Sequence, residues 1–275
     1  MYWLFLAAGL FPAPRPDANE ARVVLVRAEM HNVDGPGLAR FDQAAMVFAH
    51  TAKELEPARE PGLGACMAGE SPAEQVQGYL AGSAPMLARQ IPGLGIRLLE
   101  SPKLISQGQV RTVQAVSGST GLYASTLGGS RTGVASERPL FFGEGTIGLR
   151  VNAQDHAIAP PRYFEWPQRE AAWRQSRQTA LSVKWRKATD GEIVIALSAA
   201  EADRSAKWIL CRASAARGGF VIPPRLLQRL PLSENATLLL IWSPENVWQD
   251  IRISGFSQAW VAAFHVQGAN LALLR

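Results

Sequence analysis

Between residues 181 and 197, hydrophobic and polar side chains alternate with the period of two that is typical of a strand with one buried face. The apolar positions of this stretch are Leu181, Val183, Trp185, Ile193, Ile195 and Leu197. Asp190-Gly191 separates the two runs, and both residues tolerate the positive φ that tight turns require. The pattern therefore predicts a β-hairpin over residues 181–197.

The chain after this hairpin continues as short strands separated by turn residues. Residues 207–213 predict a strand, and Gly218-Gly219 predicts the next turn. Residues 220–222 predict a further strand, which ends at Pro223 because proline lacks the N–H that a strand ladder needs.

Similar short runs, cut by glycine and proline, recur along the rest of the chain. Residues predicted as strands are 21–30, 41–50, 96–98, 110–116, 122–127, 139–142, 146–151, 236–242, 247–253, 259–266 and 271–274. Residues 51–71 are rich in Pro, Gly and Glu and predict a long surface loop. A short helix over residues 72–80 is allowed, with Ser71 as its cap. This spacing is typical of a sandwich or barrel rather than of βαβ units.

The sequence thus predicts an all-β fold, built as an antiparallel, sandwich-like assembly. At 275 residues the chain can bury a large core, as one large domain or as two packed β-modules. The two modules would span residues 17–175 and 176–275. The irregular stretch 152–178 between them is predicted to be an extended connector over the core, with a helix over 167–177 as the alternative.

The first residues of the chain are strongly apolar. Residues 1–11 read MYWLFLAAGLF and are followed by Pro12-Ala13-Pro14. This resembles a secretory apolar segment with a small-residue cleavage zone, although the usual cationic start is missing. Residues 1–16 are therefore predicted to be a signal peptide, or else an apolar segment such as a buried strand. A signal peptide places the protein outside the cytoplasm, as a secreted, periplasmic or cell-surface protein.

Several features of the pattern fit a known group of proteins. The motifs are Val183-Lys184-Trp185, Cys211, residues 218–223, residues 226–231 and, further back, residues 79–82, 121–128 and 143–148. Their succession resembles exported, functionally unassigned all-β proteins of soil bacteria of the acidobacterial type. The resemblance implies an exported all-β protein and implies nothing catalytic.

The distribution of charged residues predicts neither a nucleic-acid partner nor a transmembrane helix. The net charge of +5 comes from arginines spread along the chain, and no Lys/Arg run with interleaved aromatic residues predicts a nucleic-acid partner. The last segment has no charged residue between Arg252 and Arg275, but Gln258, His265 and Gln267 interrupt it. A spanning helix needs about 20 predominantly apolar residues, so no transmembrane span is predicted.

The chain has two cysteines, Cys66 and Cys211. In an exported protein an even count favours a disulfide. A bond between them would close a loop of about 145 residues and remove roughly 5 kcal/mol of unfolded-state entropy. The alternative is two unrelated thiols, one in a loop and one in a core strand.

Residues that could carry chemistry are scattered. The four histidines, at positions 31, 50, 156 and 265, have no metal-ligand spacing. Asp155-His156 is the one acid–histidine pair of neighbours, and neighbours in a strand point to opposite faces. Ser117-Gly118-Ser119 lacks the Gly-x-Ser-x-Gly pattern of a nucleophile elbow. The sequence predicts no catalytic residue, no metal site and no cofactor.

Aromatic residues supply the remaining hypothesis. Four of the eight tryptophans, Trp185, Trp208, Trp242 and Trp260, lie among aliphatic residues and are predicted to fill the core. Trp166 and Trp248 lie beside polar or loop residues and are the candidates for surface ligand binding.

These observations favour an exported structural or interaction protein without catalytic activity. Its partner is unknown, a surface glycan or another protein. The alternative is a carbohydrate-binding module that uses Trp166 and Trp248. A weaker alternative is a hydrolase whose site assembles only in three dimensions, around His50 or His156.

Overall fold

The computed structural model describes residues 18–31, 37–51, 61–72, 94–131, 139–167, 173–200 and 205–275. The predicted signal peptide and most of the short helix predicted at residues 72–80 lie outside this part of the chain. The fold is mostly β, with 61% strand and 4% helix, so the all-β prediction is confirmed. No helix in the described ranges is long and apolar enough to cross a membrane.

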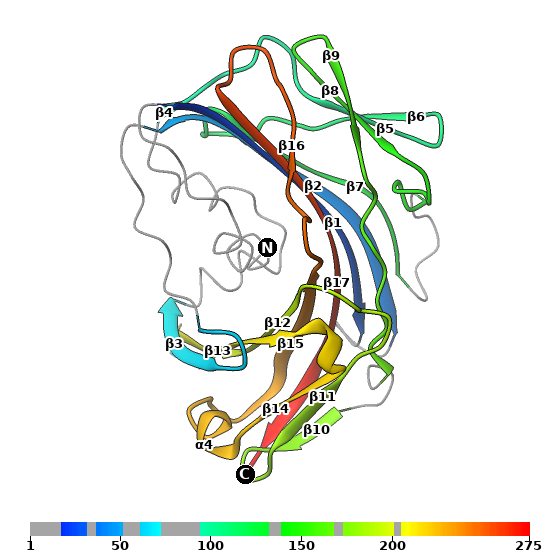
Figure 1. Ribbon diagram of the computed structural model, residues 1–275. Coiled ribbons are helices and arrows are strands. Elements are labelled where there is room, and N and C mark those ends of the chain that lie inside the picture. The colour runs from blue at the N-terminus through cyan, green and yellow to red at the C-terminus, as the bar shows by residue number, and fades with distance from the viewer. Residues whose placement is uncertain are drawn as a thin grey trace.

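One large sheet forms the body of the fold. Within the described residues it has 11 strands, ordered β3-β13-β12-β15-β17-β1-β2-β4 along its main path. It curves strongly and does not close (Figure 1). Its strands are β1 (Ala18–His31), β2 (Leu38–Thr51), β3 (Cys66–Pro72), β4 (Leu94–Gly95), β7 (Leu122–Arg131), β10 (Trp173–Ser176), β12 (Glu192–Ala200), β13 (Ser205–Ser214), β15 (Ser233–Ser243), β16 (Gln249–Asp250) and β17 (Gln258–Leu274).

Two smaller antiparallel units lie at opposite ends of the large sheet (Figure 1). One is a four-stranded sheet of β5 (Lys103–Ser106), β6 (Gln109–Thr112), β8 (Ile147–Val151) and β9 (Gln154–Ile158). The other is a two-stranded ribbon of β11 (Leu181–Lys184) and β14 (Gly219–Ile222). A 3-10 turn, η2 (Ala215–Arg217), precedes β14, and the helix α4 (Pro224–Leu227) follows it.

Alternate residues of β17 show that both smaller units cover the same face of the large sheet. Val261 and Ala263 belong to the core under the four-stranded sheet. Leu271 and Leu273 point to the same face and belong to the core under the ribbon. Phe264 and its even-numbered neighbours form a third apolar cluster on the opposite face. The fold is therefore sandwich-like at both ends of one sheet.

The large sheet is mixed. Strand β1 pairs with β17 in parallel, with residues 20–31 alongside 258–269. Strand β10 also pairs with β17 in parallel, over residues 173–176. The turn pattern of the sequence predicted only antiparallel pairs, because a parallel pair has no connecting turn to reveal it. Strands from both sides of residue 175 share this sheet.

The predicted hairpin over residues 181–197 is wrong. Strand β11 pairs with β14, and β12 pairs with β13 and β15. Leu181 and Ile193 still belong to one core, but they meet across it from two layers. Alternation identified the buried face of each strand correctly and could not identify its partner.

Two further boundaries differ from the sequence prediction. The predicted loop at 51–71 contains β3, which pairs with β13 over residues 66–72. The predicted strands 259–266 and 271–274 are one strand, β17. Gly268 lies within this strand and not at a turn. A Cβ there would lie 2.5 Å from the Met30 Sδ and 2.6 Å from Leu239 Cδ2, so these two side chains pack closely against the glycine.

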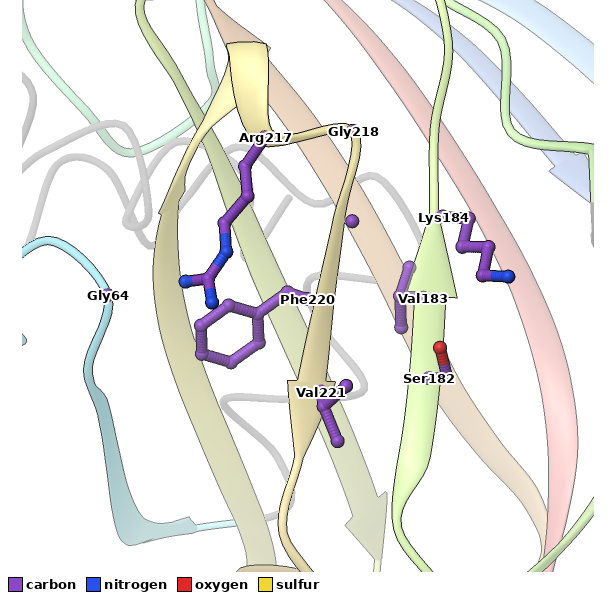
Figure 2. A pocket seen from close by; sticks show the side chains of 9 residues that line it. Gly64, Ser182, Val183, Lys184, Arg217, Gly218, Phe220 and Val221 are labelled. Atoms are coloured by element: carbon purple, nitrogen blue, oxygen red, sulfur yellow. The ribbon is translucent and has the colours of Figure 1, made fainter.

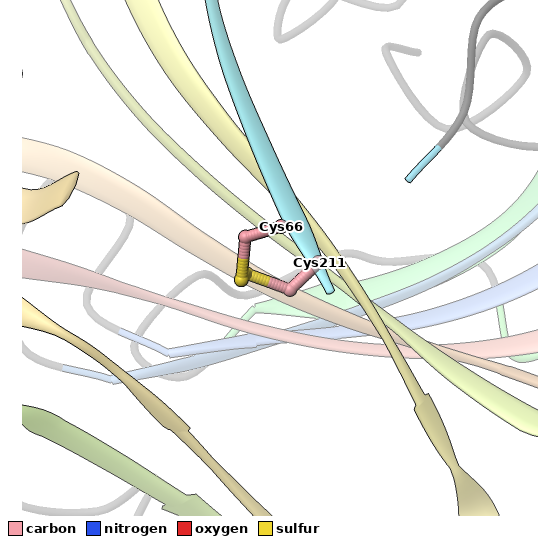
Figure 3. The surroundings of a disulfide bond; sticks show 2 residues. All are labelled: Cys66 and Cys211. Atoms are coloured by element: carbon pink, nitrogen blue, oxygen red, sulfur yellow. A yellow bond between two sulfur atoms is a disulfide. The ribbon is translucent and has the colours of Figure 1, made fainter. Parts of the chain in front are cut away.

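The predicted disulfide between Cys66 and Cys211 is confirmed. The two residues face each other on β3 and β13, with a Cα–Cα distance of 4.0 Å (Figure 3). Cys211 is fully buried in the core under the ribbon, and Cys66 packs against that core. The bond attaches the edge strand β3 to the sheet, and it is consistent with an oxidising, extracytoplasmic location.

The disulfide closes a sequence separation of 145 residues, so we expect it to stabilise the fold strongly. The double variant Cys66→Ala/Cys211→Ala should lose about 2–5 kcal/mol of unfolding free energy in urea titrations. A non-reducing peptide map of protein made in an oxidising compartment should contain the linked pair. Two freely alkylated thiols in that native protein would contradict the assignment.

Candidate functional site

The structure does not bring the two predicted ligand-binding tryptophans together. The predicted surface position of Trp166 is wrong, because its side chain is 0% exposed within the core under the ribbon. Trp248 packs against the cluster on the opposite face of the sheet, with its ring 5.9 Å from that of Phe264. Trp248 is half-buried, and its role in sugar binding stays a prediction.

Histidines and carboxylates also fail to converge in the described ranges. There, no group of three or more His, Cys, Asp or Glu side chains could hold a metal ion. Asp155 forms two hydrogen bonds with Arg150, of 2.6 and 2.7 Å, which hold the pKa of its carboxyl below the usual value. Burial lowers the pKa of His156, which is therefore neutral at pH 7. Asp155 thus pairs with arginine rather than activating the imidazole.

A buried polar row crosses the covered face of the large sheet between the two cores. Its first members are Arg27 on β1 and Asp42 on β2, which are direct neighbours in the ladder. Their side chains form a bidentate pair with distances of 2.8 and 2.9 Å. Asp42, which is fully buried, also accepts the main-chain N–H of Phe142 at 2.7 Å, and Arg27 donates to the Phe142 carbonyl oxygen. The row thereby fixes the segment around Phe142 to the sheet.

The second part of the row holds the connector that crosses the sheet. Glu29 on β1 pairs with Arg40 on β2 at 3.1 Å. The Gln267 side chain on β17 donates to the Phe164 carbonyl oxygen at 2.7 Å and accepts the main-chain N–H of Trp166 at 3.0 Å. These two bonds satisfy the buried main-chain groups of the connector. They also hold the main chain at Trp166 against the sheet, which explains why its side chain faces inward. The carboxylates of the row, Asp42 and Glu29, are buried, and its bonds hold the connector and the segment around Phe142 to the sheet.

A hollow beside the two-stranded ribbon is the candidate functional site. We call it the ribbon hollow, and its volume is about 480 Å³ (Figure 2). It is lined by Gly64, Ser182, Val183, Lys184, Arg217, Gly218, Gly219, Phe220 and Val221. Gly64 comes from the segment before β3, and the other residues come from the ribbon and from the turn that leads into β14.

Both sides of the ribbon hollow are firmly anchored. The Arg212 carbonyl oxygen on β13 accepts the N–H of Gly64 at 2.8 Å, and its guanidinium forms two hydrogen bonds with Glu192. On the other side, the buried Trp185 indole donates to the Ala215 carbonyl oxygen at 2.7 Å. The disulfide lies just behind the first anchor, at the position before Arg212. These bonds make the hollow a preformed feature of the surface.

The lining combines apolar surface with positive charge. Val221 is 55% exposed, and Leu63, next to a lining glycine, is 63% exposed. Arg217 and Phe220 extend from the same side of β14 toward the segment that carries Gly64 (Figure 2). Lys184 adds a second cation, and no acidic residue lines the hollow. An anionic partner with apolar groups therefore fits this surface.

Sequence reasoning did not identify this site, although it noticed its parts. The Gly218-Gly219 turn and the strand at residues 220–222 were both predicted. The sequence did not show which edge of the strand at residues 220–222 is paired, because its neighbour β11 was predicted to pair with β12 instead. Only three-dimensional placement shows that Val221 and Arg217 are exposed together.

Comparison with known proteins adds no assignment. No protein-family model matches the chain, and no curated protein matches it. The functional argument therefore depends on the geometry of the ribbon hollow.

The polar row yields a stability prediction with a matched control. Asp42→Asn keeps the shape of the side chain but leaves the Arg27 guanidinium without its buried counter-charge. We expect the unfolding free energy to fall by about 3–5 kcal/mol in urea titrations followed by tryptophan fluorescence. Asp155→Asn breaks an exposed bidentate pair and should leave stability unchanged. Equal effects of the two substitutions would show that burial does not decide the strength of these pairs.

Proposed function

We propose that the protein is an exported interaction protein, which binds a partner at the ribbon hollow and performs no chemistry of its own. The observation that carries this proposal is the ribbon hollow itself, where the exposed guanidinium of Arg217 lies beside the half-buried ring of Phe220 and the exposed Val221 follows on the same strand. Arg217 forms no ion pair with any residue in the described part of the chain. An arginine beside an aromatic and an aliphatic side chain is a frequent anchor of protein interfaces.

The composition of the lining favours binding over catalysis at this site. Ser182 and Lys184 are the lining side chains that could act as nucleophiles. The lining contains no His, Asp, Glu or Cys, so it offers no imidazole or carboxylate base and no metal ligand. The site offers surface and charge for recognition.

Export is supported by two independent features. The Cys66–Cys211 disulfide is consistent with an oxidising location outside the cytoplasm. Residues 1–16 have the apolar run and the small residues of a secretory segment. The resemblance to exported all-β proteins of acidobacterial type agrees with both.

Export can be measured with a reporter fusion. Residues 1–16 are joined to an alkaline phosphatase that lacks its own leader and that folds only in an oxidising compartment. We expect phosphatase activity from the natural sequence and its loss when Leu4→Arg and Leu6→Arg interrupt the apolar run. An inactive natural fusion would contradict this part of the proposal.

Binding at the ribbon hollow can be measured with two classes of probe, an array of glycans and a displayed library of random short peptides. We expect one class to be retained by the immobilised protein. Arg217→Glu should weaken that binding by roughly tenfold or more, because it reverses the charge of the anchor. Arg229→Glu makes the same change in net charge at an exposed arginine outside the lining and should have little effect. Retention of neither class, or equal retention by Arg217→Glu, would contradict the proposal.

A further inference from the structure

We infer that the partner of the ribbon hollow is an extended peptide segment with acidic side chains, which adds to the free edge of β14 as a third strand of the ribbon. This inference rests on the proposed function and names the chemistry of its partner. Four observations carry it: the register of the ribbon, the cover on its other edge, the uncharged sequence of β14, and the charge of Arg217.

The register shows which main-chain groups of β14 point outward. The N–H of Trp185 donates to the carbonyl oxygen of Gly218 at 3.0 Å. Hydrogen-bonded and non-bonded pairs alternate along an antiparallel ladder, so Val183 pairs with Phe220 through hydrogen bonds. Gly219 and Val221 fall at the non-bonded positions between them. Their N–H and C=O groups therefore point away from β11.

The two edges of the ribbon are not equivalent. Beyond the end of β11, Arg186 forms a two-way main-chain bridge with Glu165 of the connector, with distances of 2.8 and 2.9 Å. The connector thus occupies this side of the ribbon at Arg186, just beyond β11. On the β14 edge, no main-chain bond within the described ranges reaches the outward groups of Gly219 or Val221. The free edge is the one that borders the hollow.

Neither a charge nor a proline within β14 protects this edge. Natural proteins usually place a charge, a proline or a bulge on an exposed edge strand, because unprotected edges pair with other chains. Strand β14 reads Gly-Phe-Val-Ile, without a charged residue or proline inside it, and Val221 is 55% exposed. Such an edge is suited to pairing with an added strand.

Gly219 also favours the approach of a second main chain. A Cβ at this position would lie 3.0 Å from the Val183 carbonyl oxygen, so the site is tight on the ribbon side. Because Gly219 has no side chain, the hollow stays open at this position of β14. The pairing partner can therefore reach the outward groups of Gly219.

The charge of the site determines which peptide fits. Arg217 precedes β14, and a guanidinium binds a carboxylate through two parallel hydrogen bonds. An added strand would present one acidic side chain to Arg217, while its apolar residues contact Val221 and Phe220. Lys184 makes the surface more favourable for acidic peptides and less favourable for basic ones.

Proline substitutions separate main-chain pairing from side-chain contact. Peptides enriched by the immobilised protein from the displayed library are sequenced, made with a fluorescent label and titrated by anisotropy. We expect enriched peptides to alternate acidic with β-branched residues. Val221→Pro removes the N–H that points away from β11 and breaks no hydrogen bond between β11 and β14, so it should weaken binding by roughly tenfold. Val110→Pro makes the same change on β6, an edge strand outside the lining, where the N–H of Val110 also points away from its neighbouring strand and the side chain is 56% exposed, and it should change binding by less than about twofold.

Hydrogen exchange gives a readout that does not depend on how the variants fold. When the acidic peptide is added to the natural protein, the amides of Gly219 and Val221 should exchange more slowly, because they become hydrogen-bonded. Amides of the large sheet should not change. Circular dichroism of both proline variants should match that of the natural protein.

The outcomes distinguish this inference from the proposed function. Probes that lose binding in Arg217→Glu but keep it in Val221→Pro would overturn strand addition and leave binding at the hollow intact. Enrichment of basic or proline-rich peptides, or of glycans, would overturn the peptide chemistry. Retention of no probe would contradict the proposed function itself.

Discussion

The parallel pairing of β1 with β17 is the interaction on which the rest of this fold depends. β17 also pairs with β15, β10 and β16, so it links the strands of both halves of the chain. The pairing aligns Leu25 with Ala263 in one core and Arg27 with His265 in the polar row. A slip by one residue would turn every side chain to the other face and place charged groups in an apolar cluster. Two-sided burial therefore fixes the register.

The position of the candidate site follows from this register. Gln267 on β17 holds the connector at Phe164 and Trp166, and the connector then pairs with Arg186 at the end of β11. The connector is thus bonded to the end of the ribbon on the β11 side. The Trp185 indole attaches the same end of the ribbon to η2, through the Ala215 carbonyl oxygen. The position of the ribbon hollow depends in this way on buried polar contacts that lie below the surface.

Sequence reasoning found what is encoded locally. Alternation revealed the buried faces of β11 and β12, and an even cysteine count predicted the Cys66–Cys211 bond. It could not find what depends on partners far away in the chain. Trp166 has polar neighbours in sequence, yet Gln267 draws its segment inward. Gly268 looks like a break, yet it is the point where Met30 and Leu239 approach the strand. The ribbon hollow was missed for the same reason, because its free edge is defined by the absence of a neighbour.

The β1–β17 ladder also has a kinetic consequence. Glu29 and Gln267 are 238 positions apart, so closing this ladder costs roughly 5 kcal/mol of chain entropy before its contacts form. Domains dominated by such distant pairings fold slowly. During synthesis, β1 waits without its central partner until the last of the described strands has emerged. A chain that stays unfolded for that long can still be threaded through a narrow membrane channel, so the slow closure of this ladder is compatible with the export that we propose.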